Sequence, residues 1–182
     1  MNRTPILILP GYADSEPDHW QSHWERADPA CRRVVQDDWL EPRLDDWLAT
    51  LDRYVRECDS PPVLAAHSLA CALVAHWATR ATAPVKAALL VAPADVDSSL
   101  HTPEEVRGFS PVPLRPLPFP SLVVASSDDP FVSPARAETF ARAWGSRLIT
   151  LPNARHINAD AGYGPWPEGQ KLLKDLLMAI ID

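Results

Sequence analysis

Short apolar runs alternate along this chain with longer segments in which apolar residues recur every three or four positions. Unbroken apolar runs of four or five residues are typical of strands that are covered on both faces of a parallel sheet. We therefore predict about six strands, four from clear runs and two from weaker ones: 6–9, 63–66, 87–91 and 122–125, with 34–36 and 147–150 as the weaker pair.

The segments with helical spacing fall between these strands. The clearest is a segment in which Leu44, Trp47, Leu48 and Leu51 recur on one face of a helix. The same pattern predicts helices at 19–26, 44–57, 69–82, 134–143 and 170–181. Alternating strands and helices predict an α/β fold, here a three-layer α/β/α sandwich with right-handed crossovers. In such sheets, functional side chains lie in loops beyond the carboxyl ends of the strands.

The length and charge of the chain restrict its organisation and its partners. The 182 residues fit a single domain over 1–182, large enough to bury a core without a disulfide or a metal. Prolines crowd residues 103–120 and leave little room for a long helix, so we interpret this segment as a connection across the surface. The formal net charge of −7 argues against nucleic acid or a membrane as a partner, because both attract basic surfaces.

The cysteines and histidines do not form a metal or disulfide pattern. Three cysteines without C-x-x-C spacing suit free thiols in a reducing cytoplasm, and the N-terminal segment lacks the features of a signal peptide. His19 and His23 have a spacing that metals use, but the glutamate of H-E-x-x-H is missing. We therefore expect a cytoplasmic protein with no metal and no cofactor.

The most informative segment is V-L-A-A-H-S-L-A-C-A, where a predicted strand runs directly into a helix with Ser68 at the joint. A sharp turn of this kind, usually written G-x-S-x-G, needs small residues two before and two after the serine. Ala66 and Ala70 occupy those positions here. The turn would place the Ser68 hydroxyl at a helix N-terminus, where backbone N–H groups favour a developing oxyanion. Serine also commonly caps helices, so this segment alone leaves both interpretations open.

Two further segments supply the partners that a nucleophilic serine requires. Asp128 and Asp129 follow the predicted strand 122–125, and a carboxylate there can orient a histidine. We favour Asp129 and keep Asp128 as the alternative, although either acid could serve only as a turn residue. His156 follows the last predicted strand and precedes the final helix. The order Ser, Asp, His along the chain is that of α/β-hydrolases.

Candidate binding groups complete the predicted site. A glycine turn follows the first strand, so the backbone N–H of Tyr12, together with that of Leu69, could form an oxyanion hole. Seven tryptophans and the Pro-rich connection suggest an apolar pocket, with Trp20 and Trp166 as candidate substrate contacts. Trp20 and Trp24 lie four residues apart, a spacing that equally suits packing of a helix on the sheet.

These segments resemble the small serine-hydrolase family that includes the retinoblastoma-binding serine hydrolase, particularly its bacterial branch. The resemblance covers nearly the whole chain. It rests on Leu9-Pro-Gly followed by D-H-W-Q-S-H-W-E at 18–25, on His67-Ser68-Leu69, on S-D-D-P-F at 127–131, and on H-I-N-A at 156–159 with G-P-W-P-E-G at 164–169.

The resemblance implies a minimal α/β-hydrolase fold without a large cap domain. It implies the sheet order 2-1-3-4-5-6 and a triad of Ser68, Asp129 and His156. Two positions depart from the family pattern, since Ala66 and Arg155 stand where a glycine is common. The expected activity is that of a carboxylesterase-like serine hydrolase that cleaves a small acyl substrate, with amides and aminopeptidase-type substrates also open. A non-catalytic binding scaffold on the same fold, or an acyltransferase, is the alternative.

Overall fold

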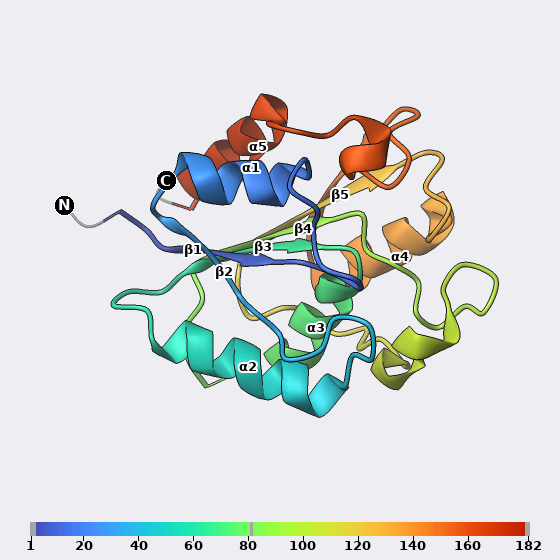
Figure 1. Ribbon diagram of the computed structural model, residues 1–182, viewed down its shortest axis with the longest axis horizontal. Coiled ribbons are helices and arrows are strands. Elements are labelled where there is room, and N and C mark those ends of the chain that lie inside the picture. Colours follow the sequence, from blue (N-terminus) through green and yellow to red (C-terminus); the bar gives the residue numbers. More distant parts are fainter. Residues whose placement is uncertain (1–2, 81, 181–182) are drawn as a thin grey trace.

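The computed structural model describes residues 3–80 and 82–180, and it consists of one parallel sheet with helices on both faces (Figure 1). The sheet has six strands, all paired in parallel: β1 (Ile6–Leu9), β2 (Cys31–Arg33), β3 (Val63–His67), β4 (Ala87–Val91), β5 (Ser121–Ser126) and β6 (Arg147–Leu151). The helices are α1 (Trp20–Ala27), α2 (Leu44–Arg56), α3 (Leu69–Ala78), α4 (Pro134–Trp144) and α5 (Pro167–Met178), with short 3-10 helices at Glu104–Phe109 and Ala159–Ala161.

The strand order is β2-β1-β3-β4-β5-β6, which confirms the predicted topology and fold class. The chain winds from β1 to β2 in one direction and then returns past β1 to continue through β3. This reversal places α1 and α5 on one face of the sheet and α2 and α3 on the other, as Figure 1 shows. Loops that follow neighbouring strands therefore converge at the carboxyl edge, where such sheets bind their ligands.

Successive strand residues bury their side chains on opposite faces, which explains the unbroken apolar runs. In β1, Leu7 and Leu9 join the core beneath α2, α3 and α4, whereas Ile8 joins the core beneath α1 and α5. Leu64 and Val63 of β3 divide in the same way. Because both faces of the four central strands are covered, few of their positions are polar.

Two predicted elements begin three residues away from their predicted first residue, and the other starts agree to within one residue. The predicted strand 34–36 is wrong by three positions, because Cys31 rather than Val34 pairs with Ile6. This is an edge strand whose arginines form surface ion pairs, so it lacks an apolar signature. The last helix begins at Pro167 rather than at residue 170, since proline suits the first turn of a helix. Its predicted end at residue 181 lies outside the described residues.

The Pro-rich segment is more than a surface connection. It contains the 3-10 helix Glu104–Phe109, and it buries Val106, Phe109 and Val112 against the core. Its N-terminal part also reaches the carboxyl edge of the sheet, where it forms one wall of the site described below. Among the described residues, no helix is both long and apolar enough to cross a membrane.

Candidate active site

Ser68 occupies a strained turn between β3 and α3. Its backbone has φ 57° and ψ −121°, a conformation that L-residues rarely adopt. The flanking Ala66 and Ala70 are fully buried, which shows why only small side chains fit on either side of the turn. The Ser68 side chain forms no capping hydrogen bond to the helix. The capping interpretation therefore fails, and the hydroxyl is free to contact another group.

Three side chains from distant parts of the sequence meet at this turn. The Ser68 Oγ lies 2.9 Å from Nε2 of His156, and Nδ1 of the same imidazole lies 3.0 Å from both carboxylate oxygens of Asp129. Asp129 is buried, and its Oδ1 also accepts a hydrogen bond from the Phe131 backbone N–H at 2.9 Å. A carboxylate in this position fixes the imidazole so that Nε2 can accept a proton from a hydroxyl.

Asp128 forms different hydrogen bonds from its neighbour Asp129. Its Oδ1 accepts hydrogen bonds from the Arg155 backbone N–H and from the Ser126 hydroxyl, each at 2.7 Å. These two donors hold the pKa of the Asp128 carboxyl below its usual value, with the Ser126 hydroxyl contributing most. Of the two acids that the sequence offered, Asp129 contacts the histidine and Asp128 anchors the loop that carries it.

The loop around His156 is strained and firmly held. Arg155 and Ile157 both have positive φ, 49° and 48°, which is costly for side chains of their size. The positive φ also explains why glycine suits position 155. Trp20 Nε1 donates to the Ile157 carbonyl at 3.1 Å, and Ala154 N–H donates to the Ser126 hydroxyl at 2.9 Å. These bonds hold the imidazole in place.

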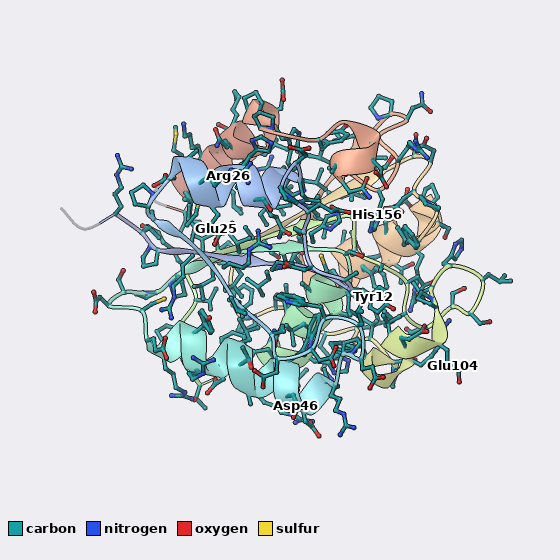
Figure 2. All side chains as sticks on the ribbon, viewed as in Figure 1. Tyr12, Glu25, Arg26, Asp46, Glu104 and His156 are labelled. Atoms are coloured by element: carbon teal, nitrogen blue, oxygen red, sulfur yellow. The ribbon has the colours of Figure 1, made fainter. Side chains whose placement is uncertain are left out.

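The two residues whose backbone N–H groups are predicted to form an oxyanion hole both line a cavity at Ser68. Tyr12 and Leu69 line the same cavity as Ser68, and in Figure 2 Tyr12 and His156 both lie at the edge toward which the strands run. Gly11 allows the chain next to Tyr12 to lie close to the turn at Ser68. A Cβ at Gly11 would lie 2.9 Å from the His67 carbonyl oxygen and 3.2 Å from the Leu69 nitrogen.

Two further histidines pack beside His156, first His67 and then His19. His67 Nε2 donates to the main-chain carbonyl of His156 at 2.8 Å, and the His67 ring packs 4.7 Å from the His156 ring and 4.6 Å from that of His19. Burial lowers the pKa of His19 to about 3 and also lowers the pKa of His67 well below its usual value. Both are therefore neutral at physiological pH. The sequence offered no signal for this cluster beyond the presence of the residues.

The space around Ser68 consists of two unequal chambers. They share Tyr12, Ser68, His156 and Asn158 as common walls. One chamber has a volume of about 280 Å³ and a mainly apolar lining. Its remaining residues are Leu69, Ala94, Val96, Thr102, Pro103, Val106 and Phe131.

The second chamber is smaller and polar. Its volume is about 100 Å³, and its other walls are Gly11, Ala13, Asp14, Glu16, His19 and His67. Asn158 stands between the chambers, and its Oδ1 accepts from the Ala161 N–H at 3.1 Å, which leaves its NH₂ group free. Sequence reasoning did not identify Asn158 or the polar chamber, because the residues that form them come from unrelated segments.

The structure corrects the predicted substrate contacts. Trp20 is fully buried and Trp166 is 6% exposed, their rings lie 5.3 Å apart, and neither lines a chamber at Ser68. Both pack between α1, α5 and the sheet, and the apolar lining comes instead from Leu69, Ala94, Val96, Phe131 and the beginning of the Pro-rich segment. The described residues contain no group of three or more His, Cys, Asp or Glu side chains placed to hold a metal ion.

The sequence of this chain matches a family model described as serine hydrolase over residues 6–175. This match spans all six strands and all of the site residues. A search of curated proteins gives no significant match.

Solved structures give a consistent result. A protein described as a YdeN-like hydrolase, from Pectobacterium atrosepticum, is 34% identical, with 98% of this chain and 92% of that chain covered and a TM-score of 0.87. The ydeN gene product of B. subtilis is 22% identical, with 97% and 100% covered and a TM-score of 0.77. Est1E from Butyrivibrio proteoclasticus shares the fold at 14% identity, with 98% and 90% covered and a TM-score of 0.69.

Proposed function

Because the chain belongs to the serine hydrolase family, as the resemblance in its sequence predicted, we propose that it hydrolyses a small ester or amide through an acyl-enzyme on Ser68. The observation that carries this proposal is the hydrogen-bonded chain from Ser68 Oγ to His156 Nε2 and from His156 Nδ1 to Asp129. No purely structural role requires a strained serine that leaves its helix uncapped and faces an imidazole.

In the first half of the reaction, His156 Nε2 removes the Ser68 proton as Oγ attacks the acyl carbonyl carbon. The backbone N–H groups of Tyr12 and Leu69 stabilise the oxyanion of the tetrahedral intermediate. The protonated imidazole then gives its proton to the leaving alcohol or amine, and the bond to the leaving group breaks. Asp129 stabilises the imidazolium throughout.

In the second half, water takes the place of the leaving group. His156 Nε2 removes a proton from the water, the water oxygen attacks the acyl carbon, and the bond from that carbon to Ser68 Oγ breaks. Ser68 recovers its proton from His156, and a carboxylic acid leaves.

The apolar chamber is the proposed site for the acyl group. At about 30 Å³ for each non-hydrogen atom, a value close to that of liquid water, a volume of about 280 Å³ holds roughly nine such atoms. Its lining includes no aspartate, glutamate, lysine or arginine side chain. We therefore propose short to medium uncharged acyl groups as substrates.

A fluorophosphonate probe provides the direct test of this function. The wild-type protein should be labelled on Ser68, and the Ser68→Ala and His156→Ala variants should lose both labelling and turnover of p-nitrophenyl acetate. His101→Ala is a suitable control, because this histidine lies outside both chambers. A scaffold without catalytic function would leave the probe unreacted, or would react equally well with and without His156.

A further inference from the structure

The small polar chamber beside Ser68 has no part in the chemistry described so far. One of its walls is His19, whose buried Nε2 has no hydrogen-bond partner among the described residues. On the basis of the proposed acyl-enzyme, we infer that this chamber is the acceptor site of the reaction. It would bind the hydrolytic water, or a small alcohol in its place, through a hydrogen bond from His19.

The hydrogen bonds of His19 determine which of its nitrogens is the donor. The Gln21 backbone N–H donates to His19 Nδ1 at 3.2 Å, so Nδ1 is unprotonated. Neutral imidazole then carries its proton on Nε2. The residue is only 2% exposed, and leaving such a donor unpaired is unfavourable. An oxygen in the chamber would satisfy it.

The walls of the chamber place that oxygen beside the reacting groups. Ser68 and His156 line the chamber together with His19, so its contents lie next to the acyl carbon and to the general base. The volume of about 100 Å³ admits roughly three non-hydrogen atoms at about 30 Å³ each. Water, methanol and ethanol fit within this limit, whereas larger alcohols exceed it.

The step balances in the ordinary way for acyl transfer. The acceptor oxygen takes a hydrogen bond from His19 Nε2–H and gives its own proton to His156 Nε2. The oxygen then bonds to the acyl carbon, and the carbon–Oγ bond to Ser68 breaks as His156 returns the proton to Oγ. The products are a carboxylic acid from water and an ester from an alcohol, so chamber size would decide between hydrolysis and acyl transfer.

The test measures how the acyl-enzyme partitions between water and added alcohols. A p-nitrophenyl ester is supplied with methanol, ethanol, 1-propanol or 1-butanol, and the acid and ester products are quantified. The wild-type protein should form methyl and ethyl esters with a decline of tenfold or more toward the butyl ester. This ratio does not depend on which step limits the overall rate.

The His19→Asn variant tests the role of the chamber while it preserves the cap of helix α1. Asparagine is a good N-cap and retains an acceptor for the Gln21 N–H, but it cannot reach the position of Nε2. The variant should hydrolyse the acyl-enzyme on the order of tenfold more slowly, and its enlarged chamber should accept propanol and butanol. His19→Gln, which restores a donor near the Nε2 position, should recover part of the hydrolysis rate. His23→Asn, one turn along α1 and outside the chamber, should leave both readouts unchanged.

An unchanged alcohol preference in His19→Asn would overturn the inference. An equal loss of acylation and deacylation would also overturn it, because that result would indicate a purely structural role. Probe labelling of Ser68 is measured on the same samples. Absence of labelling in the wild-type protein would contradict the proposed function itself, whereas normal labelling with unaltered partitioning would contradict the acceptor site alone.

Discussion

The side chain of His67 is hydrogen-bonded to the main chain of His156, with Nε2 lying 2.8 Å from the carbonyl oxygen. The residue that precedes the proposed nucleophile therefore holds the loop of the proposed base. This contact joins the last residue of β3 to a residue 89 positions later in the chain, and the loop of that residue includes three residues with positive φ, Asn153, Arg155 and Ile157. Because both groups are buried, the bond is shielded from competition with water.

Replacing His67 with phenylalanine should impair both folding and catalysis. The variant leaves the His156 carbonyl without its donor, which costs about 1–3 kcal/mol in the free energy of unfolding, and it allows the imidazole to move away from Ser68. We expect a lower midpoint in urea unfolding and a fall in kcat. His76→Phe is the matched control, because His76 Nε2 bonds to the Phe109 carbonyl at 2.7 Å, away from the site. Equal losses of kcat in the two variants would contradict a positioning role for His67.

Asp129→Asn and Asp128→Asn should differ sharply in their kinetics. Asp129 contacts His156 Nδ1, so its amide would favour the wrong tautomer, and kcat/KM should fall by about 10⁴-fold. Asp128 bonds only to the loop and to Ser126, and its amide should reduce kcat/KM far less. Steady-state kinetics on p-nitrophenyl acetate would distinguish the two. Equal losses would mean that the assignment of the acid is wrong.

Gly11→Ala should damage the proposed oxyanion hole. The added Cβ would lie 2.9 Å from the His67 carbonyl oxygen and 3.0 Å from Ser68 Cβ, and neither of these atoms can move without displacing the turn. We expect a loss of about 1–3 kcal/mol in stability and a large fall in kcat. Gly108→Ala provides the control, because a Cβ there would meet no atom within 4 Å. Full activity in Gly11→Ala would show that the turn tolerates displacement.

The buried imidazoles should make the protein less stable in mild acid. The unfolded chain protonates His19 near its ordinary pKa of 6.5, whereas the folded protein does so only near 3. Between these values the unfolded state binds more protons, so stability falls as pH decreases, by up to about 1.4 kcal/mol per pH unit for each such histidine. His67 acts in the same direction. Urea unfolding at pH 7, 6 and 5 measures the slope, which should be shallower in His19→Asn. A flat profile between pH 7 and pH 5 would contradict the prediction.

Val106→Phe should shorten the preferred acyl chain. Val106 is buried and lines the apolar chamber, so the larger ring would occupy part of its volume of about 280 Å³. Across p-nitrophenyl esters of increasing chain length, we expect the optimum to move to shorter chains with little change for acetate. Val112→Phe controls for overpacking, because Val112 belongs to the same Pro-rich segment, is buried, and lies outside the chamber. An unchanged optimum would place the acyl group elsewhere.

The sequence predicted the three proposed catalytic side chains better than it predicted the residues that contact the substrate. Ser68 and Asp129 were predicted because each follows a buried strand, and apolar strands are recognisable from their composition alone. His156 was predicted because it follows the last strand and completes the chain order Ser, Asp, His. The choice between Asp128 and Asp129 needed the structure, since adjacent side chains in a turn diverge and only their contacts tell them apart. The tryptophans misled the prediction, because a large aromatic side chain has the same appearance in a sequence whether it fills a core or lines a pocket.

The sequence by itself determined the parallel sheet, the order of its strands through the family resemblance, and the three side chains at its carboxyl edge. These follow from hydrophobic periodicity and from chain order, which are local or linear properties. Only the tertiary structure decided the two chambers, the packing of the three imidazoles and the bond from His67 to the His156 carbonyl. Each of these depends on the distance between segments that lie far apart along the chain, and that distance is set by the packing of helices on the sheet rather than by any single segment.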